Sequence, residues 1–240
     1  MDQLRAVLFD LDDTLFSTTS FARVARSKAV EAMVNAGLDL PVDEVQRELD
    51  EVIAEFSSNY DHHFDQLLRR LRPRSFPNVN PAVIVASGVT AYHDTKYEML
   101  APFEDVVPLL QALTGVGCIA GIVTHGWTTK QAEKIVRLGL LPHLSPEAIF
   151  ISDQIGISKP NPKLYTAALD KLGLSPSQAM YVGDSPTNDI APPRSLGMKT
   201  VWARRSARNS LEGTGIEADH IVNDFVELRG ILREVYGLEV

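Results

Sequence analysis

The first apolar run of the chain, Ala6-Val7-Leu8-Phe9, is followed directly by Asp10-Leu11-Asp12-Asp13-Thr14. A short, continuous apolar run bounded by polar residues is typical of a strand that is buried on both faces. Asp10 and Asp12 stand two positions apart, so on an extended chain their carboxylates lie on one side, ~7 Å apart. A bend at the strand end can direct both at one ligand, where one attacks and the other moves a proton. The same pattern also occurs in ordinary turns.

Five further apolar runs of this kind follow, at residues 118–123, 148–151, 179–182, 200–202 and 220–222. Segments with helical periodicity separate most of them. This alternation predicts a parallel sheet with helices on both faces, so the expected fold class is α/β, a doubly wound parallel sheet. In such sheets, binding sites form at the carboxyl ends of the strands. Polar residues that follow these runs are therefore the first candidates for function.

One long interval breaks the alternation of strands and helices. Residues 21–100 contain no convincing strand but four helical stretches, at 21–36, 42–56, 64–71 and 81–99. This pattern predicts an α-helical domain inserted into the α/β domain. The expected boundaries assign residues 1–16 and 102–240 to the core domain and residues 17–101 to the helical domain.

A second acidic cluster, which includes Asp184 and Asp189, follows the run at 179–182. Several carboxylates that converge on one site repel each other, because two unit charges 4 Å apart cost about 4 kcal/mol at an effective dielectric constant of 20. A divalent cation removes this repulsion, and oxygen-only ligands favour Mg²⁺. Asp189 also fits a simpler role near the start of the following helix.

Candidate phosphate ligands follow two other predicted strands. Thr124-His125-Gly126 ends the run at 118–123, and Lys159 lies in a loop before a predicted helix. A threonine hydroxyl, nearby backbone N–H groups and a lysine ammonium are the groups that hold a phosphate oxygen. Taken singly, a threonine at a strand end is usually a turn residue and an exposed lysine is usually solvated.

In this order and on these strand ends, the four segments resemble the phosphatase branch of the haloacid dehalogenase superfamily. Residues 10–14 match its first motif, Thr124 its second, Lys159 its third, and Asp184 with Asp189 its fourth. The helical insert corresponds to the type-1 cap of that superfamily. The resemblance covers essentially the whole chain.

The resemblance implies roles for the acidic residues. Asp10 would be the nucleophile that forms an aspartyl-phosphate, and Asp12 would be the general acid and base. Asp10, the backbone carbonyl of Asp12 and Asp184 would hold Mg²⁺, with Asp189 in support.

The resemblance also implies which residues contact the substrate. Thr124 and the neighbouring backbone at His125 and Gly126 would bind the phosphate, and Lys159 would neutralise charge between nucleophile and phosphate. Position 125 often carries Asn or Asp in relatives, and a histidine there makes the contact sensitive to pH.

Part of the predicted helical domain, residues 21–71, resembles archaeal members of the superfamily that are glyceraldehyde 3-phosphate phosphatases. His63, Arg69 and Arg70 of this segment are candidate contacts for a small sugar phosphate. The two arginines also fit a solvated helix face beside a buried stripe of Phe64 and Leu68.

The predicted function is therefore hydrolysis of a small phosphomonoester by a Mg²⁺-dependent enzyme. A phospho-aspartate switch uses similar residues on a doubly wound sheet, but Asp12 and the helical insert favour an enzyme. A dehalogenase of the same superfamily lacks the second aspartate, so Asp12 argues against it. A phosphomutase would use the same residues and stays open.

Composition bounds the partners and the compartment. With 23 Lys and Arg against 31 Asp and Glu, the formal net charge is -8, which argues against nucleic acid or an anionic membrane as partner. The single cysteine, Cys118, excludes an internal disulfide framework and indicates a reducing, cytoplasmic setting. Cys118 and Trp202 are interpreted as packing residues. We expect a monomer or homodimer that acts on a small phosphorylated metabolite.

Overall fold

The computed structural model describes residues 3–56, 60–71, 76 and 78–240. Its internal contacts divide the chain into two compact units. We call Met1–Thr18 together with Ala101–Val240 the core unit, and Thr19–Leu100 the cap unit. Among the described residues, no helix combines the length and the apolar character that crossing a bilayer requires.

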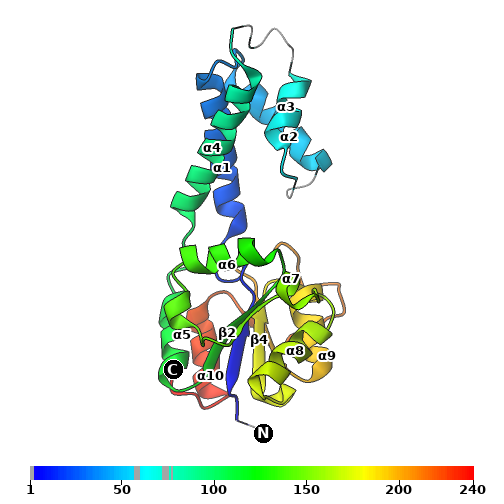
Figure 1. Ribbon diagram of the computed structural model, residues 1–240. Coiled ribbons are helices and arrows are strands. Elements are labelled where there is room, and N and C mark those ends of the chain that lie inside the picture. Colours follow the sequence, from blue (N-terminus) through cyan, green and yellow to red (C-terminus); the bar gives the residue numbers. More distant parts are fainter. Residues whose placement is uncertain (1–2, 57–59, 72–75, 77) are drawn as a thin grey trace. The chain divides into compact units, whose positions relative to one another are not determined.

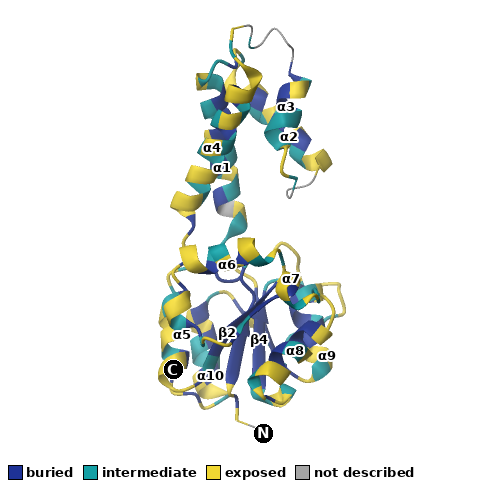
Figure 2. Ribbon diagram, in the orientation of Figure 1, coloured by how far each residue is buried: buried dark blue, intermediate teal, exposed yellow. Residues whose placement is uncertain are grey.

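Within the described residues, the core unit is built on a six-stranded parallel sheet with strand order β3-β2-β1-β4-β5-β6. The strands are β1 (Ala6–Phe9), β2 (Ile119–Thr124), β3 (Ile149–Ile151), β4 (Ala179–Gly183), β5 (Lys199–Ala203) and β6 (His220–Val222). Each expected apolar run forms a strand, and Figure 2 shows that these strands are largely buried. The predicted α/β fold with a doubly wound parallel sheet is confirmed.

Helices cover both faces of this sheet, with α5 and α10 on one side and α8 and α9 on the other (Figure 1). Side chains of β1 alternate between the two faces: Leu8 belongs to the cluster that contains Tyr165 of α8, whereas Phe9 packs edge-to-face on Phe225 of α10. The helices of the core unit are α5 (Val106–Gly115), α6 (Thr128–Arg137), α7 (Ser152–Ile155), α8 (Lys163–Leu172), α9 (Ala191–Leu196) and α10 (Phe225–Glu234).

The strand order reverses beside β1. β2 pairs with one edge of β1, and β4 pairs with the other edge. This reversal is a topological switch point, where ligands of open α/β sheets bind. Asp10 follows β1, Thr124 ends β2 and Asp184 follows β4, so three of the candidate residues lie at the carboxyl ends of adjacent strands.

The cap unit is helical throughout its described regular structure. It contains α1 (Thr18–Asn35, beginning at the last residue of the core unit), α2 (Val42–Phe56), α3 (His63–Arg70) and α4 (Pro81–Met99). Val45, Leu49 and Val52 follow one another on the buried face of α2, and they join a cluster of aliphatic side chains from all four helices. Gly88 of α4 permits the close approach of α1, because a Cβ atom there would lie 2.8 Å from Cγ of Met33.

Candidate active site

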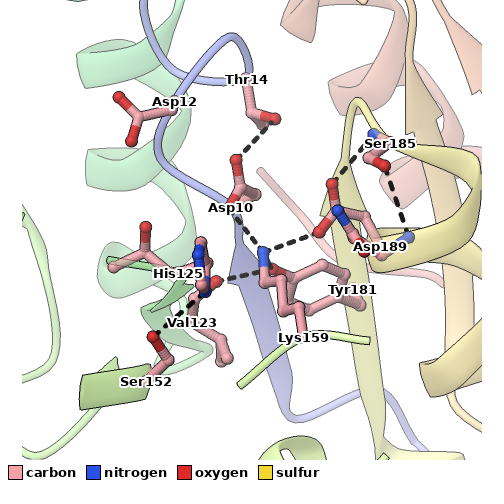
Figure 3. Close-up of polar contacts among 12 residues, drawn as sticks. Asp10, Asp12, Thr14, Val123, His125, Ser152, Lys159, Tyr181, Ser185 and Asp189 are labelled. Atoms are coloured by element: carbon pink, nitrogen blue, oxygen red, sulfur yellow. Dashed lines mark hydrogen bonds and ion pairs between the residues drawn. The ribbon is translucent and has the colours of Figure 1, made fainter. Parts of the chain in front are cut away.

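A buried lysine connects the third motif to the first and the fourth (Figure 3). The ammonium group of Lys159 donates to Oδ1 of Asp10 at 2.5 Å, to Oδ1 of Asp189 at 2.7 Å and to the hydroxyl of Tyr181 at 2.7 Å. All three of its protons are therefore used. Since the side chain of Lys159 is 3% exposed, this is a desolvated ion-pair cluster in which every partner is defined by the fold.

The tyrosine below this lysine was not expected from the sequence. Tyr181 lies inside the apolar run of β4, and its hydroxyl donates to the backbone oxygen of Val123 on β2 at 2.7 Å. Its ring packs edge-to-face on Tyr165, with ring centroids 4.9 Å apart. The hydroxyl thus accepts from Lys159 and donates to Val123 of β2. These two hydrogen bonds fix the position of the ammonium group relative to the sheet.

Three carboxylates form a possible metal site. One oxygen from each of Asp10, Asp184 and Asp189 lies within 4.8 Å of the others. Burial, with Asp10 and Asp189 adding to it, raises the pKa of Asp184 to about 8. Burial also raises the pKa of Asp10 to about 7, against the attraction of Lys159. A divalent cation would relieve both effects, so this all-oxygen donor set fits one.

The lysine of this cluster keeps its charge. Burial alone would lower the pKa of Lys159, but the carboxylates of Asp10 and Asp189 outweigh burial and raise it above the ordinary lysine value. The cluster therefore contains one permanent positive charge among three acidic groups. This leaves room for additional positive charge and explains why a cation is favoured at the site.

The loop after β4 is shaped to hold Asp189 inward. A Cβ atom at Gly183 would lie 2.4 Å from Cβ of Asp189, so only glycine leaves room for this aspartate. The backbone N–H of Ser185 donates to Oδ2 of Asp189 at 2.9 Å. Asp189 lies in the π-helical turn η4 (Pro186–Ile190), and it contacts the site in addition to any effect on the following helix.

Two further features define the surroundings of this loop. The indole N–H of Trp202 donates to the backbone oxygen of Asp184 at 2.7 Å, so this residue does more than fill the core. The helix α9 begins at Ala191, and Pro192 and Pro193 occupy its first turn, where a missing N–H costs little. The prolines are therefore compatible with the inward position of Asp189.

The second aspartate of the first motif has separate partners. Nζ of Lys134 lies 2.7 Å from both carboxylate oxygens of Asp12, and Nε2 of Gln131 donates to Oδ2 at 2.9 Å. Figure 3 shows the carboxylate of Asp12 directed away from that of Asp10. Gln131 and Lys134 were not among the expected site residues.

The expected phosphate loop follows β2. Thr124 is buried, and its hydroxyl accepts from Nε2 of Gln131 at 2.7 Å. His125 is exposed, with Nδ1 2.5 Å from Oγ of Ser158. Gly126 has φ 141°, a value that favours glycine, and its N–H donates to Oγ of Ser152 at 3.0 Å. The structure thus brings this loop to the edge of the sheet that carries Asp10.

Asp13 holds the chain near Thr18, the last residue of the first segment of the core unit. It has φ 58°, in the left-handed region that short polar residues tolerate best after glycine. Its Oδ1 accepts from the backbone N–H and the hydroxyl of Thr18, both at 2.7 Å. Nε of Arg208 donates to Oδ2 of Asp13 at 2.9 Å. Arg208 could not be predicted as a partner of Asp13, because 195 positions separate the two residues.

The three other candidate residues lie on α3 of the cap unit. Arg70 pairs with Glu55 and, at 3.8 Å, with Glu48 of the same unit. Arg69 is exposed, and the half-buried ring of His63 packs edge-to-face on Tyr60. Their contact with a substrate stays a prediction.

The fold and the acidic site define the class of protein. The chain belongs to the haloacid dehalogenase-like hydrolases, whose family model matches residues 4–197. Its fold is also that of solved structures: a phosphatase of this superfamily from Thermococcus onnurineus (TM-score 0.66, 24% identity, 95% of this chain and 98% of that one) and a family hydrolase from Deinococcus radiodurans (TM-score 0.65, 24% identity, 98% and 97%).

Two curated relatives narrow the class. The chain is 42% identical over 239 residues to a glyceraldehyde 3-phosphate phosphatase from Methanopyrus kandleri, which covers 97% of this chain and 98% of the relative. It is 38% identical to a protein of the same name from Pyrococcus furiosus, with 99% and 96% covered. The predicted resemblance to this superfamily and to its archaeal phosphatases is confirmed.

Proposed function

We propose that this protein is a Mg²⁺-dependent phosphatase that hydrolyses a small phosphomonoester, with glyceraldehyde 3-phosphate as the first substrate to test. The observation that carries the proposal is the cluster of Asp10, Asp184 and Asp189 around the ammonium of Lys159. Phosphoryl transfer depends mainly on positioning and electrostatic stabilisation, and this cluster supplies both. The names of the full-length relatives support the substrate class.

In the first step, a carboxylate oxygen of Asp10 forms a bond to phosphorus, and the bond from phosphorus to the substrate oxygen breaks. Asp12 gives its proton to that leaving oxygen. In the second step, water attacks the phosphorus of the aspartyl-phosphate while Asp12 takes the proton of the water. The bond between phosphorus and Asp10 then breaks, and inorganic phosphate is released.

The remaining residues bind and orient. Thr124, with the backbone at His125 and Gly126, would hold the non-transferred phosphate oxygens. Lys159 would balance the charge of the nucleophile and the phosphate. Asp10, Asp184, the backbone carbonyl of Asp12 and, indirectly, Asp189 would hold Mg²⁺. When bound, the cation supplies positive charge that offsets repulsion between the phosphate and the carboxylates.

The cap unit would contribute substrate specificity through His63, Arg69 and Arg70. We further propose a cytoplasmic monomer or homodimer whose partner is the phosphorylated metabolite alone. The formal net charge of -8 supports the exclusion of polyanionic partners.

The test is the release of inorganic phosphate from a panel of small phosphorylated metabolites, with Mg²⁺ present and after exhaustive chelation. We expect hydrolysis that requires the cation and that favours triose and sugar phosphates. Activity that survives chelation would contradict the metal site. An isomeric sugar phosphate as product, without phosphate release, would identify a phosphomutase, and a stable phospho-protein without turnover would identify a switch.

A further inference from the structure

The two aspartates of the first motif are held by two different lysines. Asp10 is paired with Lys159, and Asp12 is paired with Lys134. The first pair is almost fully buried, with side chains 9% and 3% exposed, whereas the second is partly open, at 29% and 21%. Two carboxylates only two positions apart are therefore drawn toward different partners.

The two side chains that contact Asp12 lie on one face of the helix α6. Gln131 and Lys134 are three positions apart on this helix, so their side chains are neighbours. The Gln131 side chain is buried, and its Nε2 lies 2.7 Å from both Oγ1 of Thr124 and the backbone oxygen of His125. The amide of Gln131 has two protons for three acceptors, so its longest contact, 2.9 Å to Oδ2 of Asp12, shares a proton with the phosphate loop. Because Gln131 is anchored to that loop, this contact places the carboxylate beside it.

This arrangement answers a physical problem of the site. A free carboxylate at position 12 could turn toward the same cation and the same lysine that serve Asp10. It would then compete with the nucleophile and lose its position for proton transfer. Both carboxylate oxygens of Asp12 lie 2.7 Å from Nζ of Lys134, which holds this side chain apart from the cluster of Asp10, Asp184 and Asp189.

We propose that Lys134, together with Gln131, is a positioning residue that holds Asp12 for its acid and base steps. This inference rests on the proposed phosphatase function. Lys134 does not itself contact the reacting atoms in this proposal. It separates the two aspartates, so that one serves as nucleophile and the other as proton donor.

The kinetic test is Lys134→Met, with Lys171→Met as control, because Lys171 is an exposed lysine at the end of α8. For an alkyl phosphate, whose leaving oxygen needs a proton, we expect kcat/KM to fall by about 10-fold, since misplacing a catalytic group costs about that much or more. For an aryl phosphate with a good leaving group, we expect kcat/KM to change by less than about 2-fold. Lys134→Arg should restore most of the loss, and Lys171→Met should resemble the wild type.

A double variant separates positioning from other roles. In an Asp12→Asn background, Lys134→Met should cause no further loss of kcat/KM, because the lysine acts through the missing carboxylate. An equal loss in both backgrounds would overturn the proposal. A rise of KM alone, the same for every substrate, would also overturn it and would make Lys134 a phosphate-binding residue.

A readout without turnover distinguishes failure of this inference from failure of the proposed function. The melting temperatures of the wild type, Asp12→Asn, Lys134→Met and the double variant form a thermodynamic cycle. We expect non-additive shifts, with Lys134→Met lowering Tm only when Asp12 is present. Additive shifts would overturn the positioning role of Lys134 even in an active enzyme. A wild type that hydrolyses no phosphomonoester would instead overturn the proposed function, whatever the cycle shows.

Discussion

Among the described residues, the core unit buries charged side chains, whereas the cap unit buries only apolar ones. Every buried polar or charged residue that the structure describes belongs to the core unit, including Asp10, Thr124 and Asp189. The buried cluster of the cap unit is aliphatic, and its Arg70 meets its acidic partners near the surface. Burying charge is costly unless the groups are paired. The core unit therefore carries the part of the molecule that substitution tolerates least.

The sharpest test of this contrast is the nucleophile. Asp10→Asn should lower turnover of an aryl phosphate by about 10⁴-fold or more, because the amide cannot form the covalent intermediate. Asp12→Asn should slow dephosphorylation by ~10²–10⁴-fold and let the phospho-enzyme accumulate. Intact-protein mass after acid quench measures both. A phosphoryl adduct on Asp10→Asn would show that the roles are assigned wrongly.

A smaller effect is expected from Gly183→Ala. The added methyl group would overlap Asp189, where the distance to Cβ would be 2.4 Å, and would push this carboxylate out of the acidic cluster. We expect the Mg²⁺ concentration for half-maximal activity to rise by about 10-fold or more, as for other changes around metal ligands. Gly230→Ala is the control, because a Cβ atom there meets nothing within 4 Å. An unchanged cation requirement in Gly183→Ala would contradict the site.

The buried acids also predict how stability depends on pH. The folded-state pKa of Asp184 is about 8 and that of Asp10 about 7, against an ordinary value of 3.8. Between these values the folded state binds more protons than the unfolded state, so stability falls as pH rises from about 4 to 8. Without cation, Tm should drop by about 10 °C or more between pH 5 and pH 8.

The cation and one variant sharpen this expectation, and calorimetry measures both. Mg²⁺ should raise Tm more at pH 8 than at pH 5, because it binds the ionised carboxylates. Asp184→Asn should flatten the dependence on pH. A slope that is unchanged in this variant would place the responsible groups elsewhere.

The smallest effect should come from the cap unit. Arg69→Ala should leave turnover of an aryl phosphate within about 2-fold, because the aryl group offers little for a specificity residue to bind. The ratio of kcat/KM between a sugar phosphate and the aryl phosphate should fall by about 10-fold. Arg47→Ala on α2, an exposed arginine of the same unit, is the control. If the wild type, Arg69→Ala and Arg47→Ala had equal ratios of kcat/KM between the sugar phosphate and the aryl phosphate, Arg69 would not contact the substrate.

Much of the fold followed from local patterns. Each strand of the sheet is a short apolar run that is followed by a polar residue. β1, for example, ends at Phe9 and is followed by Asp10. The four cap helices lie close to the predicted stretches, and α2 begins and ends at the expected residues, Val42 and Phe56. These features depend on periodicity and on the end of each run, which a sequence displays directly.

The missed residues depend on contacts across the sheet. Tyr181 reads as one more residue of an apolar strand, and only the fold brings its hydroxyl under Lys159. Gln131 and Lys134 occupy one face of an ordinary amphipathic helix, and 122 positions separate Lys134 from Asp12. No local pattern distinguishes such side chains from a solvated helix surface. Motif residues could be predicted, but the residues that orient them could not.

The hydrogen bond from Trp202 to the backbone oxygen of Asp184 gives the protein an optical reporter. The chain has only two tryptophans, and the second, Trp127, directly follows the phosphate loop and is 64% exposed. The emission of an indole depends on the polarity around it and on its N–H hydrogen bond. Emission from Trp202 should therefore respond when the Asp184 loop takes up a cation, and emission from Trp127 should respond to phosphate. With Trp127→Phe, intrinsic fluorescence could follow cation binding without turnover or an added label.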